Sequence, residues 1–99
     1  MKSNFEKGTV YLGEVPERKT IRVEFNVISD RNINKVEPAC GCTPSTFSQK
    51  AVYFKYRTGS LPLHLRDKGR GLIDKSIMVF FSDGTKEEIY VKAILVNKI

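Results

Sequence analysis

The feature that most constrains this chain is an alternation of apolar and polar residues with a period of two. Residues 19–27 place Ile21, Val23, Phe25 and Val27 on one face, with polar side chains between them. Residues 74–81 and 86–96 repeat the pattern with Ile77, Val79, Phe81, Ile89, Val91, Ala93 and Leu95. Side chains of a β-strand point to alternate faces, so this period predicts half-buried strands. No window of a dozen residues has helical spacing, which indicates an all-β chain.

Turn signals and strand formers divide the chain further. Asp83-Gly84 stands between two alternating runs and predicts a tight hairpin. Residues 51–57 are rich in aromatic and β-branched residues and predict another strand, one of whose faces must turn an aromatic outward. Shorter strands are expected at 9–12, 33–36 and 40–43, and an irregular loop at 58–71. About seven short strands in a single domain, residues 1–99, predict an antiparallel β-sandwich.

Composition excludes several classes of protein. The longest apolar run, residues 77–81, is far shorter than the roughly 18 residues of a membrane-spanning helix. The first six residues lack the apolar stretch of a signal peptide, which favours synthesis and release in the cytoplasm. The formal net charge is +6. Such a charge favours acidic partners, although it also serves to keep a small domain dispersed.

The order of motifs resembles one family of domains. Residues 8–10 read Gly-Thr-Val, residues 36–39 read Val-Glu-Pro-Ala, and Cys40, Gly41, Cys42 and Thr43 follow. This is similar to a bacterial and phage family of immunoglobulin-like domains of unknown function with a Cys-Gly-Cys-Thr signature, itself similar to Hydin-like and PapD-like (major sperm protein-like) sandwiches. The resemblance covers residues 5 to 96 and implies an immunoglobulin-like β-sandwich. The family brings no known reaction, and the lack of a leader favours an intracellular or virion setting.

The two thiols allow two interpretations. Cys40 and Cys42 could offer thiolates to a soft metal, but a structural zinc ion needs four ligands and His64 is the one further good ligand. The interpretation that we favour is structural, with one cysteine packed in the core and Gly41 allowing a bend. Nothing in the spacing places His64 beside a thiol as a base. We therefore expect no catalytic residue, no metal and no cofactor.

A basic segment is the most distinctive candidate for a binding surface. It contains His64, Arg66, Lys68 and Arg70, with Lys75 close behind. In extended form the alternating cations would share one side, where they could meet phosphates or an acidic protein surface. No aromatic residue is interleaved with them, so stacking of nucleic-acid bases is unsupported in this segment. We expect these five residues to contact an acidic protein surface.

Together these features predict a protein that works by docking and carries out no reaction. The expected function is a non-enzymatic protein–protein interaction or structural module that binds a larger assembly through loops or a sheet edge, with a decoration or accessory role on a phage virion as a refinement. The alternative is a cytosolic nucleic-acid-binding module that uses the basic residues of 63–70 together with Arg18, Lys19 and Arg22. The oligomeric state and the free sheet edge stay open.

Overall fold

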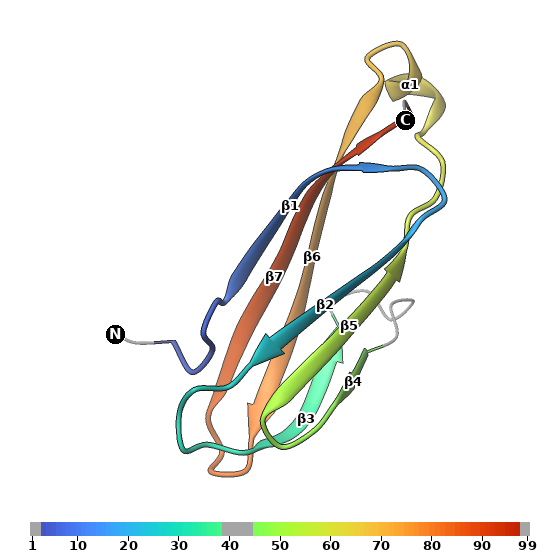
Figure 1. Ribbon diagram of the computed structural model, residues 1–99. Helices are drawn as coiled ribbons and strands as arrows, with labels where there is room; N and C mark the ends of the chain where they lie inside the picture. Colours follow the sequence, from blue (N-terminus) through green and yellow to red (C-terminus); the bar gives the residue numbers. More distant parts are fainter. Residues whose placement is uncertain (1–2, 39–44, 98–99) are drawn as a thin grey trace.

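Two β-sheets stacked on each other form the domain (Figure 1), in a computed structural model that describes residues 3–38 and 45–97. The four-stranded sheet has the order β1-β7-β6-β3, and the three-stranded sheet has the order β2-β5-β4. The elements are β1 (Thr9–Pro16), β2 (Thr20–Asn26), β3 (Ile33–Pro38), β4 (Ser45–Phe47), β5 (Ala51–Arg57), α1 (Leu63–Arg66), β6 (Arg70–Phe81) and β7 (Lys86–Val96). The predicted all-β sandwich of about seven strands is confirmed.

One strand pair departs from the expected antiparallel arrangement. β1 pairs with β7 in parallel, from Thr9 opposite Tyr90 to Pro16 opposite Val96. The expectation was wrong for this pair because an alternating pattern specifies which face of a strand is buried but not the direction of its neighbour. The pairing is interrupted between Tyr11 and Glu14, where Gly13 adopts a φ of 72°. A bulge with glycine in the left-handed region bends the strand at this point.

The predicted hairpin joins β6 to β7. Their antiparallel register runs from Arg70 opposite Val96 to Phe80 opposite Lys86. The turn is closed by the Phe81 amide, which donates to the Thr85 carbonyl at 2.8 Å, and Gly84 has a φ of 90°. A residue with a side chain rarely adopts that φ, which explains why the turn uses glycine.

The core lies between the sheets and follows the alternation seen in the sequence. Its larger cluster unites the three-stranded sheet with the inner face of the β6–β7 hairpin; its buried members are Phe5, Phe25, Ile33, Val52, Phe54, Ile77, Val79, Phe81, Ile89 and Val91. The ring of Phe5 packs edge-on against Phe25, with centroids 6.3 Å apart. A second cluster continues the core toward α1 and consists of Ile21, Leu61, Ile73, Ala93 and Leu95. Phe54 is buried while its neighbour Tyr53 is 43% exposed, which confirms the predicted outward aromatic on β5.

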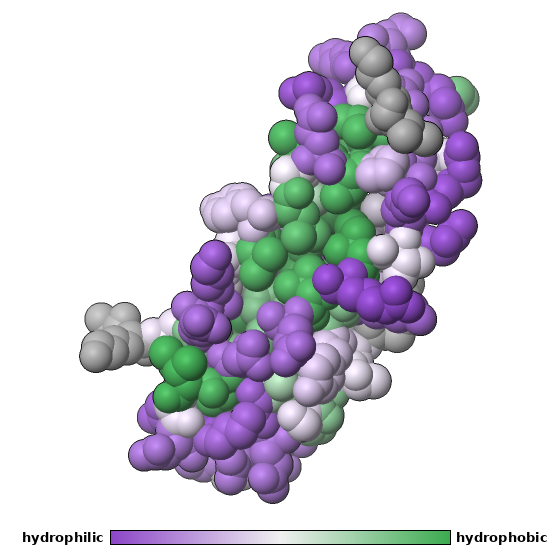
Figure 2. Space-filling view, viewed as in Figure 1, coloured by the Kyte–Doolittle hydropathy of each residue, from purple (hydrophilic) through white to green (hydrophobic). Residues whose placement is uncertain are grey.

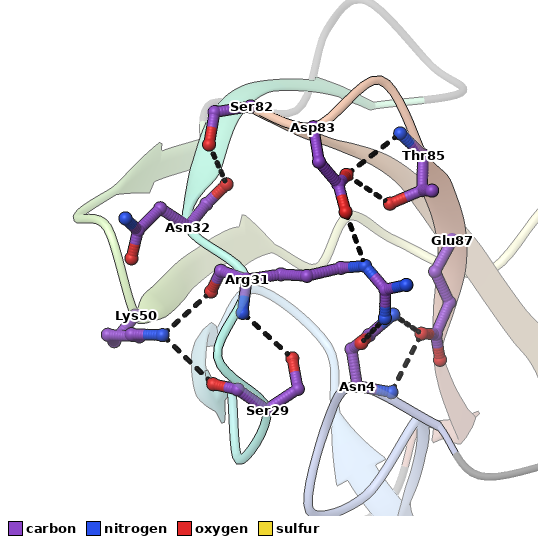
Figure 3. A network of polar contacts seen from close by, with 9 residues as sticks. All are labelled: Asn4, Ser29, Arg31, Asn32, Lys50, Ser82, Asp83, Thr85 and Glu87. Atoms are coloured by element: carbon purple, nitrogen blue, oxygen red, sulfur yellow. Dashed lines mark hydrogen bonds and ion pairs between the residues drawn. The ribbon is translucent and has the colours of Figure 1, made fainter.

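A polar network closes the end of the sandwich opposite α1 (Figure 3). The Arg31 guanidinium donates to the Asp83 carboxylate at 2.7 Å and to the Asn4 side-chain oxygen at 2.8 Å. Asn4 in turn donates to Glu87 from its backbone and its side-chain nitrogen, each at 2.9 Å. Lys50 donates to the carbonyls of Ser29 and Arg31 at 2.9 and 2.8 Å. The network therefore joins the N-terminal segment, the β2–β3 connection and the β6–β7 turn.

We expect replacement of Phe25 by alanine to reduce the free energy of unfolding by about 3–5 kcal/mol, because it removes a fully buried ring and leaves a cavity. Ile28→Ala is the matched control, since Ile28 is 65% exposed. Urea-induced unfolding measures both. Equal losses in the two variants would contradict the placement of the core.

The Asp83 network makes a pH-dependent contribution to stability. Hydrogen bonds from Thr85 and Arg31 lower the pKa of Asp83 from 3.8 to about 2. A lowered pKa means that the contribution is present above pH 4 and is lost as the pH falls from about 4 to about 2. We expect Asp83→Asn to be less stable than wild type at neutral pH and to lose less stability across that window. Asp30→Asn, which alters an exposed aspartate of the neighbouring connection, should retain the wild-type profile in acid denaturation.

Candidate binding surface

The segment between β5 and β6 is more ordered than expected. The prediction of an irregular loop at 58–71 is wrong for two stretches, because α1 occupies Leu63–Arg66 and β6 begins at Arg70. The Leu65 amide donates to the Pro62 carbonyl at 2.9 Å, and the Gly69 amide donates to Leu65 at 3.1 Å. Gly69 has a φ of 73° and turns the chain into β6. A single helical turn is too short to leave a periodic signal in the sequence, which is why the pattern missed it.

Buried contacts hold the start of this segment against the sandwich. Thr58 is 1% exposed, and its hydroxyl accepts from the Lys19 amide at 2.7 Å and donates to the Pro16 carbonyl at 2.9 Å. Leu61 is buried, and its amide donates to the Glu17 carboxylate at 2.5 Å. The β1–β2 turn and the base of the α1 segment are therefore joined to each other. Together with α1 they form one end of the molecule, which we call the α1 end (Figure 1).

The structure brings together three of the five predicted partner-binding residues. Arg66, Lys68 and Arg70 are exposed and line a hollow of about 560 Å³ at the α1 end. The expected extended row of cations is wrong, because α1 and the turn at Gly69 separate their backbone positions. Two carboxylates, Glu14 and Asp67, line the same hollow, and Arg70 pairs with Glu14 at 3.2 Å. The hollow is therefore of mixed charge.

The other two predicted contacts lie differently. His64 is exposed on α1. Lys75 is partly buried on β6, about 17 Å along the strand from Arg70. Its ammonium nitrogen lies 5.0 Å from the centroid of the Tyr56 ring, so it makes a cation–π contact at the inner side of the sandwich. Partner binding by His64 and Lys75 stays a prediction.

The Cys-Gly-Cys-Thr motif, Cys40 to Thr43, lies outside the described residues. Within residues 3–38 and 45–97, no group of three or more His, Cys, Asp or Glu side chains could hold a metal ion. In the same ranges, no helix has the length and apolar character needed to cross a membrane. Both interpretations of Cys40 and Cys42, as metal ligands and as structural residues, therefore stay predictions.

A surface that the sequence did not reveal lies between the two sheets. Figure 2 shows an apolar strip along the long axis, between β1 and β2, with hydrophilic side chains on either side. β1 and β2 are edge strands of opposite sheets. Their inward side chains Val10, Leu12, Val15 and Val23 are only partly buried and pack against the core clusters. We call this surface the β1–β2 strip.

The backbone beside the strip offers unused hydrogen-bonding groups. Residues 4–6 pair with the end of β2, where the Glu6 amide donates to the Asn26 carbonyl at 3.0 Å. In the part of the chain that the structure describes, no strand pairs with the outer edge of β2 before that point. The apolar strip is therefore bordered by a strand edge that can accept another strand. No local pattern predicts this arrangement, since it depends on which strands become edges.

Comparisons of the chain with protein-family models, with curated proteins and with solved structures found no match.

The contacts of Thr58 provide a test of how the α1 end is held. We expect Thr58→Val to lower the free energy of unfolding by about 1–3 kcal/mol, because the Lys19 amide and the Pro16 carbonyl lose their partner in two partly buried hydrogen bonds. Thr58→Ser keeps the hydroxyl and should lose less. Urea unfolding of both variants checks the order, and equal losses would show that the hydroxyl contributes nothing.

Proposed function

We propose that this protein is a non-enzymatic protein-binding module that docks an extended segment of its partner along the β1–β2 strip. The observation that carries the proposal is the partly exposed apolar strip beside the unpaired part of the β2 edge. An added strand satisfies backbone groups along the sheet edge, and its alternate side chains cover the apolar floor. The expected partner segment is therefore extended, with apolar residues at every second position.

The basic side chains at the α1 end favour a partner that carries acidic residues. The strip reaches toward this end, where Val15 and Leu65 pack against the second core cluster. Arg66, Lys68 and Arg70 are exposed there, and Arg18 donates to Ser60 at 3.1 Å beside them. Acidic residues next to the partner's extended segment would meet these cations. Charges at the rim of an interface mainly accelerate association.

The partner that suits such a module is a component of a larger assembly that presents an extended acidic-flanked segment. A decoration or accessory position on a phage virion is the particular setting that we propose, on the strength of the resemblance of the Cys40–Thr43 motif alone. Synthesis in the cytoplasm is proposed with it.

Selection of peptides from a displayed random library against the immobilised protein tests the docking mode. We expect selected peptides to alternate apolar and polar residues, with Asp or Glu at one end. Methylation of alternate backbone nitrogens in a selected peptide should abolish binding, because those amides would pair with the β2 edge. Methylation of the intervening nitrogens should be tolerated. Peptides without alternation, or binding insensitive to every methylation, would contradict the proposal.

Substitutions locate the peptide on the protein. We expect Leu12→Lys to abolish binding of the selected peptide. Leu72→Lys is the control and should leave binding intact, because Leu72 lies on the outer face of the four-stranded sheet and is 76% exposed. Circular dichroism confirms that both variants fold. Neutralising Arg66, Lys68 and Arg70 together should slow association and leave dissociation nearly unchanged. Equal effects of the two lysine substitutions would place the site elsewhere.

A further inference from the structure

The outer face of the three-stranded sheet carries an unusual arrangement of like charges. Arg22 on β2 lies directly opposite Lys55 on β5. Directly opposed residues of an antiparallel pair have Cβ atoms about 4.5–5.5 Å apart, and like charges at that separation destabilise the sheet. Arg57 continues the same face of β5, opposite Thr20. All three cations are exposed, and none has an ion-pair partner within residues 3–38 and 45–97.

An aromatic ring and a hollow accompany these cations. Tyr53 occupies the same face of β5, two residues before Lys55, and is 43% exposed. A hollow of about 480 Å³ is lined by Arg22, Glu24, Thr46, Tyr53 and Lys55, together with Val23 and Phe54. Glu24 is the one carboxylate in this lining and lies opposite Tyr53. The face thus combines three cations with one aromatic ring and one anion.

The register explains why the sequence did not reveal this surface. The basic segment at 63–70 has no interleaved aromatic residue. On β5, however, Tyr53, Lys55 and Arg57 share one side at intervals of about 6.8 Å, and β2 adds Arg22 beside them. The interleaving that single-strand recognition requires is therefore produced by pairing two strands that lie some thirty residues apart.

We propose that this face binds single-stranded nucleic acid, with phosphates held by Arg22, Lys55 and Arg57 and a base stacked on Tyr53. Phosphates would relieve the repulsion between the opposed cations. Among the described residues, only the Glu24 carboxylate lies beside these cations, and it offsets their charge only in part. An exposed ring on a basic sheet face offers a base a stacking partner. A duplex does not use the ring in this way, because its bases are already stacked. This activity uses a different surface from the β1–β2 strip and goes beyond the proposed docking function.

Fluorescence anisotropy with a labelled oligothymidylate of about 12 nucleotides, within the roughly 4–16 that a small domain covers, tests the proposal. Three phosphate contacts predict a slope of log affinity against log salt of about −2, since each contact on a single strand contributes about −0.7. Lys55→Gln should reduce the slope by about 0.7. Lys86→Gln is the matched control, because Lys86 is an exposed lysine on β7 of the opposite sheet. Equal weakening by both variants would show that affinity depends only on the net charge of the protein, and it would overturn the proposed site.

Tyr53 distinguishes nucleic acid from other anions. We expect Tyr53→Ala to weaken oligothymidylate binding by about 5- to 150-fold, and Tyr53→Phe to preserve it, because stacking needs only the ring. Thermal unfolding should show Lys55→Gln at least as stable as wild type, since it removes a like-charge opposition. The proposal is overturned if a duplex of equal length binds as tightly. It is also overturned if polyglutamate competes equally well and Tyr53→Ala binds like wild type.

Discussion

The register of the β6–β7 hairpin determines nearly everything else in this domain. The two longest strands pair along their full length around the turn at Gly84. Their inward residues contribute to both core clusters, as Val79 does to the larger cluster and Ile73 to the second. A slip of one residue would exchange every inward side chain for an outward one. The inner face would then present charged residues such as Asp74 and Lys92 to the other sheet. The glycine turn and the core therefore specify the same register, which is the local and global agreement expected of a chain with one fold.

The two outer faces of the sandwich use charge in opposite ways. On the four-stranded sheet, cations are matched by anions: Lys92 lies 3.9 Å from Asp74, and Lys35 lies 2.8 Å from Glu37. The Tyr90 hydroxyl donates to Glu88 at 2.8 Å, which raises the pKa of Tyr90. On the three-stranded sheet, Arg22 instead faces Lys55. Exposed ion pairs contribute little to stability, so this difference says more about what each face can bind than about what holds the fold together.

Features that depend on one strand at a time were predictable from the sequence. The alternation around Phe25 predicted β2, the composition of 51–57 predicted β5 with its outward Tyr53, and Asp83-Gly84 predicted the hairpin. Features that depend on which strands become neighbours were not. The parallel pairing of β1 with β7, the edge position of β2 and the opposition of Arg22 to Lys55 arise only from the strand order. The α1 turn was missed for another reason, because four residues cannot display a helical period.

Strand β2 links the two surfaces that we propose to be functional. Its inward Val23 borders the β1–β2 strip, and its outward Arg22 belongs to the basic face, because neighbouring residues of a strand point in opposite directions. A partner segment paired with the β2 edge would extend the three-stranded sheet by one strand. Its outward side chains would then stand beside Arg22 and Thr20, on the face that carries Lys55 and Arg57. Acidic residues at those positions would compete with phosphate for Arg22, whereas basic or neutral residues would enlarge the basic face. If both proposals hold, binding at one surface would be coupled to binding at the other through the outward residues of the docked segment.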